Sequence, residues 1–150
     1  MPRNRFRLTT LLKLREQVRT ERREQLAEAY RADEILERQR EAARSEHAEL
    51  QASRGGLSVG ERVDLDRLLE AERYAMVLRA QEELAGRQRE AIAEEIERRR
   101  QALVQADREV RVLEHLRDRH AARCRAAEAK GEMRDLDEAA QRRFAREEEP

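Results

Sequence analysis

Histidine and cysteine are among the side chains of this sequence that could bind a metal ion or act as a nucleophile. There are three histidines, His47, His115 and His120, and one cysteine, Cys124. His115 and His120 are five residues apart, which places them on different faces of a helix, so we do not expect them to share a metal ion. A single cysteine excludes an intrachain disulfide. We interpret Cys124 as a small buried side chain and His120 as a packing or register contact.

The sequence motifs of the common enzyme classes are absent. There is no glycine-rich phosphate loop followed by lysine, no GxSxG, no HExxH and no CxxC. The many carboxylates show no spacing that would pair an acid with a base for catalysis. The sequence therefore predicts a protein that is not an enzyme and that uses no cofactor and no metal.

The elements that carry these residues are predicted to be long helices. Charged residues make up 44% of the 150 residues and aromatic residues only 3%, which leaves too few large apolar side chains for an ordinary globular domain. Most polar residues are strong helix formers, and the only two prolines are Pro2 and Pro150. The formal net charge is zero, from 33 basic and 33 acidic residues, which argues against a nucleic-acid-binding protein.

One break interrupts the helical pattern, at the segment ASRGGLSVGERVD. Gly55, Gly56 and Gly60 favour a chain reversal there, and Ser58 followed by Glu61 has the spacing of a helix capping box. We therefore predict one all-α domain, an antiparallel two-helix coiled-coil hairpin with a longer second helix that overhangs the first. Its predicted parts are helix one at about 5–53, a turn at 54–58, helix two at about 59–130 and a C-terminal motif at 131–150.

A stripe of mostly apolar positions follows the break at alternating steps of three and four residues. Such spacing is typical of a coiled coil, and we expect the polar positions within it to fix the register. The stripe has eighteen positions, thirteen of them apolar: Leu68, Ala71, Ala75, Leu78, Glu82, Ala85, Arg89, Ile92, Ile96, Arg99, Leu103, Ala106, Val110, Leu113, Arg117, His120, Cys124 and Ala127.

The second predicted helix is longer than the first, so part of it should lack a partner helix. If the turn centres near Gly56, the numbers of facing residues add up to about 112, and Arg5 faces Asp107. Apolar residues beyond that point should be uncovered, which is typical of partner-binding surfaces; self-association and fraying are the alternatives. The residues expected to be uncovered are Val110, Leu113, Leu116 and Cys124, then Met133, Leu136, Ala140 and Phe144.

The start of the sequence is basic. Five basic residues and no acidic residue precede Glu16, and positive charge at a helix N-terminus opposes the helix dipole. The acidic tail, an acidic partner or an anionic membrane surface would each compensate this charge. Lys13 and Arg15 interrupt the apolar run, so it predicts no signal peptide, and no segment approaches the ~20 apolar residues of a membrane span. We expect a cytoplasmic protein.

The two ends of the sequence resemble the FliJ family, the helical-hairpin component of the flagellar type III export apparatus. FRLTTLLKLREQ (Phe6 to Gln17) is similar to the start of that family, and VLEHLRDRHAARCRAAEAKGEMRDLDEAAQRRF (Val112 to Phe144) is similar to its end. The resemblance implies a non-enzymatic stalk that binds the hexameric export ATPase and links it to the export gate protein FlhA. It also implies export chaperones as further partners, no nucleic acid, and a peripheral location at the inner face of the cell membrane.

The motif positions carry the binding roles of the family over to this sequence. For the export gate the resemblance implies Leu68, Tyr74 and Ala75. The related stalk of virulence-type secretion systems would look similar, and a self-associating coiled-coil scaffold is the other alternative. For the ATPase the resemblance implies Leu8, Leu11, Leu12, Arg15, Leu113, Leu116, Arg117, Leu136, Asp137 and Glu138.

Overall fold

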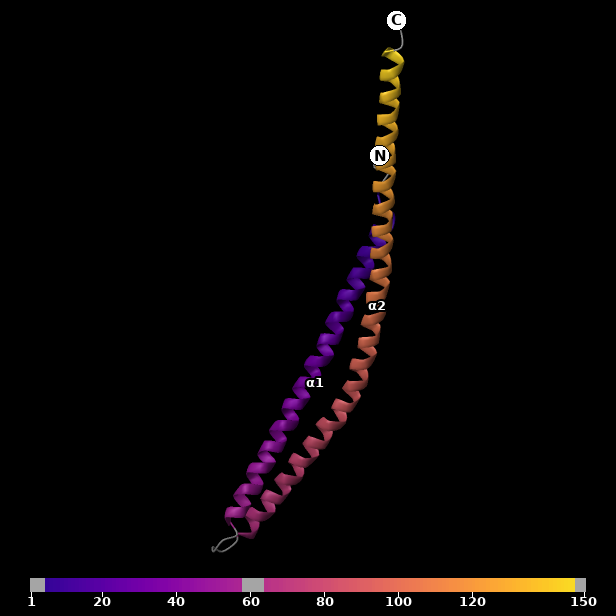
Figure 1. The fold of residues 1–150 in the computed structure, drawn as a ribbon. Coiled ribbons are helices and arrows are strands. Elements are labelled where there is room, and N and C mark those ends of the chain that lie inside the picture. Colours follow the sequence, from indigo (N-terminus) through magenta and orange to yellow (C-terminus); the bar gives the residue numbers. More distant parts are fainter. Residues whose placement is uncertain (1–4, 58–63, 148–150) are drawn as a thin grey trace. The chain divides into compact units, whose positions relative to one another are not determined.

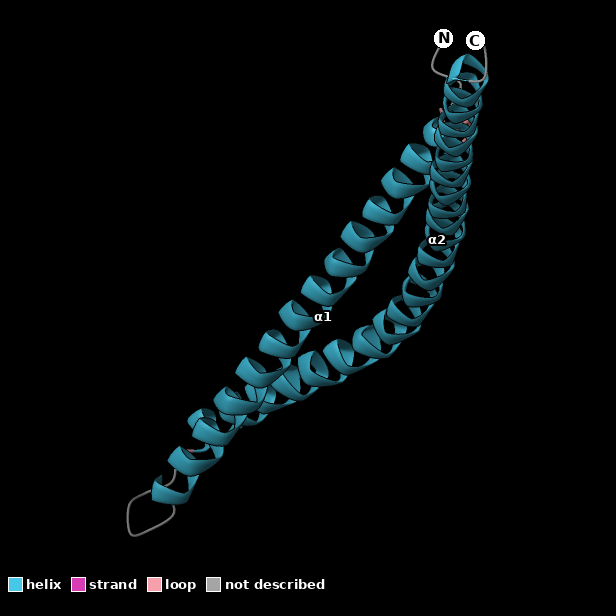
Figure 2. Ribbon diagram, turned by 45° about the horizontal axis from the view of Figure 1, so that its top comes forward, coloured by secondary structure: helices cyan, strands magenta, loops and turns pink. Residues whose placement is uncertain are grey.

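Two α-helices make up almost all of the described chain. The computed structural model describes residues 5–57 and 64–147, with the backbone alone described at 55–57 and 147. Helix α1 is Thr9–Leu57, with 49 residues, and helix α2 is Leu65–Glu147, with 83 residues (Figure 1). Among the described residues there is no strand (Figure 2). The predicted all-α helical hairpin is confirmed.

Each helix begins with a hydrogen bond between a side chain and the backbone. At the start of α1 the hydroxyl of Thr9 donates to the carbonyl oxygen of Phe6 at 2.7 Å. At the start of α2 the backbone N–H of Asp66 donates to Oδ1 of Asp64 at 3.2 Å, the geometry of an N-cap. Asp64, rather than the predicted Ser58, therefore caps α2; Ser58 and Glu61 lie outside the described residues.

The Asp64 cap leads to a first prediction. Replacing Asp64 with alanine removes the acceptor, and we expect the free energy of unfolding to fall by about 0.5–2 kcal/mol. The Asp64→Asn variant keeps an acceptor oxygen and should stay close to wild type. Urea unfolding followed by circular dichroism measures both. Equal stability of the alanine and asparagine variants would contradict the cap.

Glycine does not end either helix where the sequence predicts. Helix α1 continues through Gly55 and Gly56 to Leu57, so the prediction of a turn at 54–58 is wrong for 54–57. Helix α2 begins at Leu65 rather than near 59, and continues through Gly131 to Glu147, so the predicted end near 130 is also wrong. A glycine inside a helix costs only about 1 kcal/mol relative to alanine. The strong helix formers around it outweigh that cost.

Contacts divide the chain into two compact units, which we describe separately. The terminal unit comprises Met1–Thr20 and Gln105–Pro150, and the central unit comprises Glu21–Val104. Each unit contains a segment of α1 and a segment of α2. That the whole chain behaves as a single domain stays a prediction.

In the central unit, ion pairs between the two helices define the register. Arg54 Nη2 lies 2.5 Å from Glu72 Oε1, and Arg44 Nε lies 2.5 Å from Glu82 Oε1. The residue numbers of both pairs add up to 126, so the predicted register near 112 is wrong. The error follows from the glycine pair, because α1 continues through Gly55 and Gly56 to Leu57 instead of ending before them.

The predicted seam of α2 is confirmed over most of its length. Every seam position from Ala71 to Leu113 is buried or half-buried, and Ala75 is fully buried. Leu68, Arg117 and Ala127 are exposed. The buried residues of the central unit are mostly small: Ala29, Ala43, Ala75, Leu78 and Ala85. Small side chains let helix backbones approach closely but bury little apolar area in each layer.

Polar seam residues of the central unit bind the opposite helix. Arg89 donates to both carboxylate oxygens of Asp33, at 2.8 and 3.0 Å, and also binds Glu37. The hydrogen bonds from Arg89 lower the pKa of the Asp33 carboxyl below its ordinary value of 3.8. These contacts support the expectation that the polar positions fix the register.

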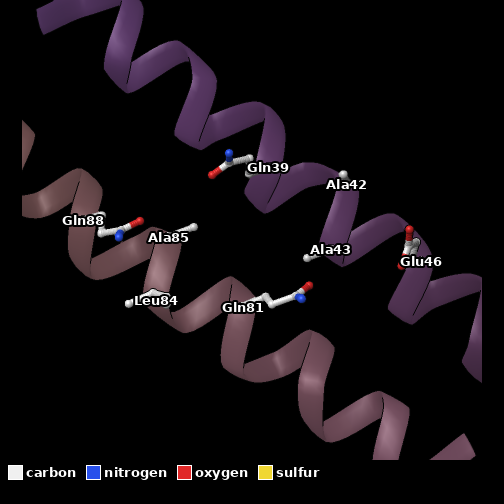
Figure 3. Close-up of a pocket in the computed structure, with 8 residues that line it drawn as sticks. All are labelled: Gln39, Ala42, Ala43, Glu46, Gln81, Leu84, Ala85 and Gln88. Carbon is white, nitrogen blue, oxygen red and sulfur yellow. The ribbon is translucent and has the colours of Figure 1, made fainter.

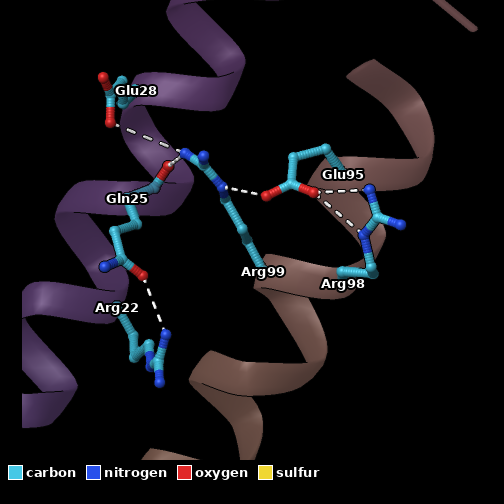
Figure 4. Close-up of polar contacts among 6 residues, drawn as sticks. All are labelled: Arg22, Gln25, Glu28, Glu95, Arg98 and Arg99. Atoms are coloured by element: carbon cyan, nitrogen blue, oxygen red, sulfur yellow. Dashed lines mark hydrogen bonds and ion pairs between the residues drawn. The ribbon is translucent and has the colours of Figure 1, made fainter. Parts of the chain in front are cut away.

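A second arginine of the seam reaches the backbone of α1. Arg99 Nη1 donates to the carbonyl oxygen of Gln25 at 2.5 Å and lies 3.7 Å from Glu28 Oε2. Its Nε donates to Glu95 of its own helix at 2.7 Å (Figure 4). Glu95 also accepts from Arg98, and these two arginines lower the pKa of its carboxyl. Arg99 thereby connects α1 to α2 while it is also bonded to Glu95 of its own helix.

Candidate functional site

The terminal unit has a small apolar core where the start of α1 packs on α2. Leu12, Val110 and Leu113 form this core, and Val110 is fully buried. Arg15 Nη1 lies 2.7 Å from Glu109 Oε2, and Arg19 Nη1 lies 3.4 Å from Asp107 Oδ1. Basic residues at the start of α1 are thus paired with acids of α2.

An aromatic contact lies at the far end of this packed region. The rings of Phe6 and His120 have centroids 5.8 Å apart, with their planes tilted by 55°. Cys124 Sγ lies 3.8 Å from Nδ1 of the same histidine, one helical turn away. His120 and Cys124 are both half-buried, which agrees with their interpretation as packing residues.

The uncovered stretch of α2 begins later than the sequence predicts. Val110 and Leu113, which were expected to be uncovered, lie in the core with Leu12. The reason is the register: the numbers of Arg19 and Asp107 add up to 126, so α1 covers about fourteen more residues of α2 than the predicted register allows. Cys124 is half-buried beside His120, which contacts Phe6.

Beyond Cys124 the helix is exposed on all sides. Every described residue from 125 to 146 is exposed, and Met133, Leu136 and Phe144 each keep 70% of their accessible surface. A shallow hollow between Leu136 and Phe144 is lined by Ala139, Ala140 and Arg143. We call Met133, Leu136, Ala140 and Phe144 the C-terminal stripe.

The structure separates the residues predicted for ATPase binding into available and unavailable ones. Leu12 and Leu113 are buried at 5% and 8% exposure, so they hold the two helices together and present no surface to a partner. Arg15 is paired with Glu109. The residues predicted for ATPase binding whose side chains are exposed are Leu8, Leu11, Leu116, Arg117, Leu136, Asp137 and Glu138.

Two further exposed apolar residues of the terminal unit were not predicted. Leu14 is 54% exposed and Val112 is 60% exposed. Val112 lies between the seam positions Val110 and Leu113. An apolar residue at a position outside the seam is the sequence feature that could have indicated this exposed side chain. Together with Leu116, Val112 gives α2 an apolar surface beside the core.

Residues predicted for export-gate binding lie in the central unit, and they differ in exposure. Leu68 is 37% exposed, and Tyr74 is 48% exposed with its hydroxyl donating to Glu46 Oε2 at 2.6 Å. That bond and the charge of Glu46 raise the pKa of Tyr74. Ala75 is fully buried and offers no surface to a partner.

The central unit also has a hollow between its two helices. Gln39, Ala42, Ala43 and Glu46 of α1 line one side, and Gln81, Leu84, Ala85 and Gln88 of α2 line the other (Figure 3). Gln88 also lines an adjacent, more apolar hollow with Ile35, Leu36 and Ile92. Alanine at facing positions leaves this space open.

The chain matches a known protein family over nearly its whole length. The family described as the flagellar FliJ protein matches residues 4–149, nearly the whole chain. The chain belongs to the FliJ family. Membership of the FliJ family makes it a component of flagellar protein export, and it confirms the resemblance carried by the two end motifs. Comparisons with curated proteins and with solved structures gave no match.

Within 5–57 and 64–147, neither helix has an apolar stretch long enough to cross a membrane. The same residues bring together no group of three metal-binding side chains.

Proposed function

We propose that the chain is the non-enzymatic stalk of the flagellar type III export apparatus. It binds the hexameric export ATPase through exposed apolar side chains of the terminal unit. It links the ATPase to the export gate protein FlhA and acts in the cytoplasm, peripherally at the inner face of the cell membrane. Export chaperones are further partners, and nucleic acid is not one.

One observation supports ATPase binding above the others. The chain belongs to the FliJ family, and its C-terminal stripe is exposed in the part of α2 that α1 does not cover. Exposed apolar side chains aligned on one helix face are a recurrent way to dock a helix into a partner. Leu8, Leu11 and Leu116 extend the available apolar surface toward the packed core.

Support for a gate contact is confined to two residues. Leu68 and Tyr74 are exposed in the central unit, whereas burial removes Ala75 from the proposal. The family that matches is the flagellar one, which favours the flagellar apparatus over a virulence-type system.

The ATPase proposal predicts a difference between two matched charge insertions. Leu136→Glu places a charge in the C-terminal stripe, and we expect the dissociation constant for the ATPase to rise about 10-fold or more because apolar burial is lost. Met76→Glu is the control, since Met76 is 66% exposed in the central unit. Binding is measured by titration, together with ATPase assembly and turnover.

Two results would contradict the proposal. One is a wild-type chain that changes neither the assembly nor the turnover of the ATPase. The other is an equal loss of binding in the two variants. Leu113 is unsuitable for this experiment, because it is buried and a charge there would disrupt the terminal unit.

A further inference from the structure

We infer that the C-terminal stripe pairs with the same stripe of a second copy, in antiparallel orientation. The stripe has steps of three, four and four residues, which add up to an eleven-residue repeat. That repeat stays on one face of a nearly straight α-helix. At about 100° per residue, its four side chains fall within an arc of about 80°.

The face that carries the stripe differs from the face that α1 covers. Ala106, Val110 and Leu113 are buried on one side of α2. Counting about 100° per residue places the stripe on roughly the opposite side of the helix. Pairing through the stripe therefore leaves the packed core of the terminal unit intact.

Charge on the two halves of this segment identifies the second copy as the occupant. Among residues 132–146, the charged side chains within about 90° of the stripe are Glu132 and Asp137 in the first half and Arg143 in the second half. In an antiparallel pair, the acidic half of each copy faces the basic half of the other. A parallel pair would set like charges against each other, which is unfavourable. A two-fold symmetric interface requires such self-complementarity.

One register satisfies the shape and the charge together. Glu132 and Arg143 lie on the same flank of the stripe, so Glu132 of each copy can face Arg143 of the second copy. In this register Leu136 lies opposite Ala139 and Ala140 of the second copy, a large residue against small ones. The paired segments end before they reach Phe6 and His120, so the aromatic contact is not disturbed.

The interface is short, and the dimer should be weak. The stripe contributes only four apolar side chains from each copy, so we expect a dissociation constant on the order of 100 µM. Charged pairs at its edge should make pairing weaker as the salt concentration rises. Pairing occupies the stripe that we propose binds the ATPase, so the two interactions compete, but the inference does not depend on the export role.

Charge reversal tests the pairing with the full chain in sedimentation equilibrium. Glu132→Arg and Arg143→Glu each create two like-charge pairs, so each variant alone should dimerise about 10-fold more weakly. An equimolar mixture of the two restores both opposite-charge pairs and should recover wild-type association. Arg142→Glu is the matched control, because Arg142 lies about 160° from the stripe, where it pairs with Glu138 of its own helix.

Three outcomes would overturn the inference. The first is a wild-type chain that stays monomeric from micromolar to near-millimolar concentration. The second is a dimer that weakens no more in the two reversal variants than in the Arg142→Glu control. The third is a mixture that fails to recover association. Circular dichroism of each variant verifies that α2 remains folded, and none of these measurements involves the ATPase.

Discussion

Replacing Val110 with aspartate is expected to separate the start of α1 from α2. Val110 is fully buried in the core formed with Leu12 and Leu113. A buried carboxyl without a hydrogen-bond partner is costly, so we expect the free energy of unfolding of the terminal unit to fall by more than ~3 kcal/mol. Val110→Ala removes only apolar contacts and should cost roughly 1–3 kcal/mol. Urea unfolding measured by circular dichroism compares the two variants with wild type.

Val112 provides the control for this prediction. It lies two residues away on the same helix and is 60% exposed, so Val112→Asp should change stability by no more than about 0.5 kcal/mol. Equal destabilisation by aspartate at the two positions would mean that Val110 is not the centre of a core. It would also contradict the register that places Leu12 over α2.

Replacing Arg89 with methionine is expected to lower the stability of the central unit most strongly near neutral pH. Without Arg89, the half-buried carboxylates of Asp33 and Glu37 face each other with no cation between them. Arg89 lowers the pKa of Asp33 below 3.8, so its stabilising effect is complete above that value and is lost as the pH falls through the lowered pKa. The difference between variant and wild type should therefore narrow below pH 3.8.

Thermal unfolding across this pH range checks the prediction. We expect the melting temperature of Arg89→Met to lie several degrees below wild type at neutral pH and to approach wild type in acid. Arg87→Met is the control, because Arg87 is exposed and lies 4.0 Å from Glu83 on its own helix. A difference that does not depend on pH would mean that the effect of Arg89 is packing alone.

The spacing of the apolar residues predicted which face of α2 would be buried, because positions on one face of a helix recur every three or four residues. The steps of three and four residues hold from Ala71 to Leu113, through Glu82, Arg89 and Arg99. These charged residues do not break the seam, because each of them finds an oppositely charged side chain or a backbone carbonyl oxygen across it.

The register between the two helices could not be predicted in the same way, because a change in where one helix ends shifts every pair of facing residues. Gly55 and Gly56 favour a turn in isolation, yet both lie within α1. The cap at Asp64 is equally visible in the sequence but competes with the capping-box spacing of Ser58 and Glu61. Because α1 continues to Leu57, the facing residues shift, Val110 and Leu113 are covered, and the C-terminal stripe remains the uncovered part.

The pairing of Phe6, His120 and Cys124 has a consequence for following the protein in solution. Cys124 is the only cysteine of the chain, and it lies half-buried beside His120, whose ring contacts Phe6. A thiol reagent therefore modifies a single sulfur atom, and we expect its rate of reaction to rise when the contact between Phe6 and His120 opens. Without any substitution, this thiol reports on the opening of the terminal unit, alone or with a partner bound.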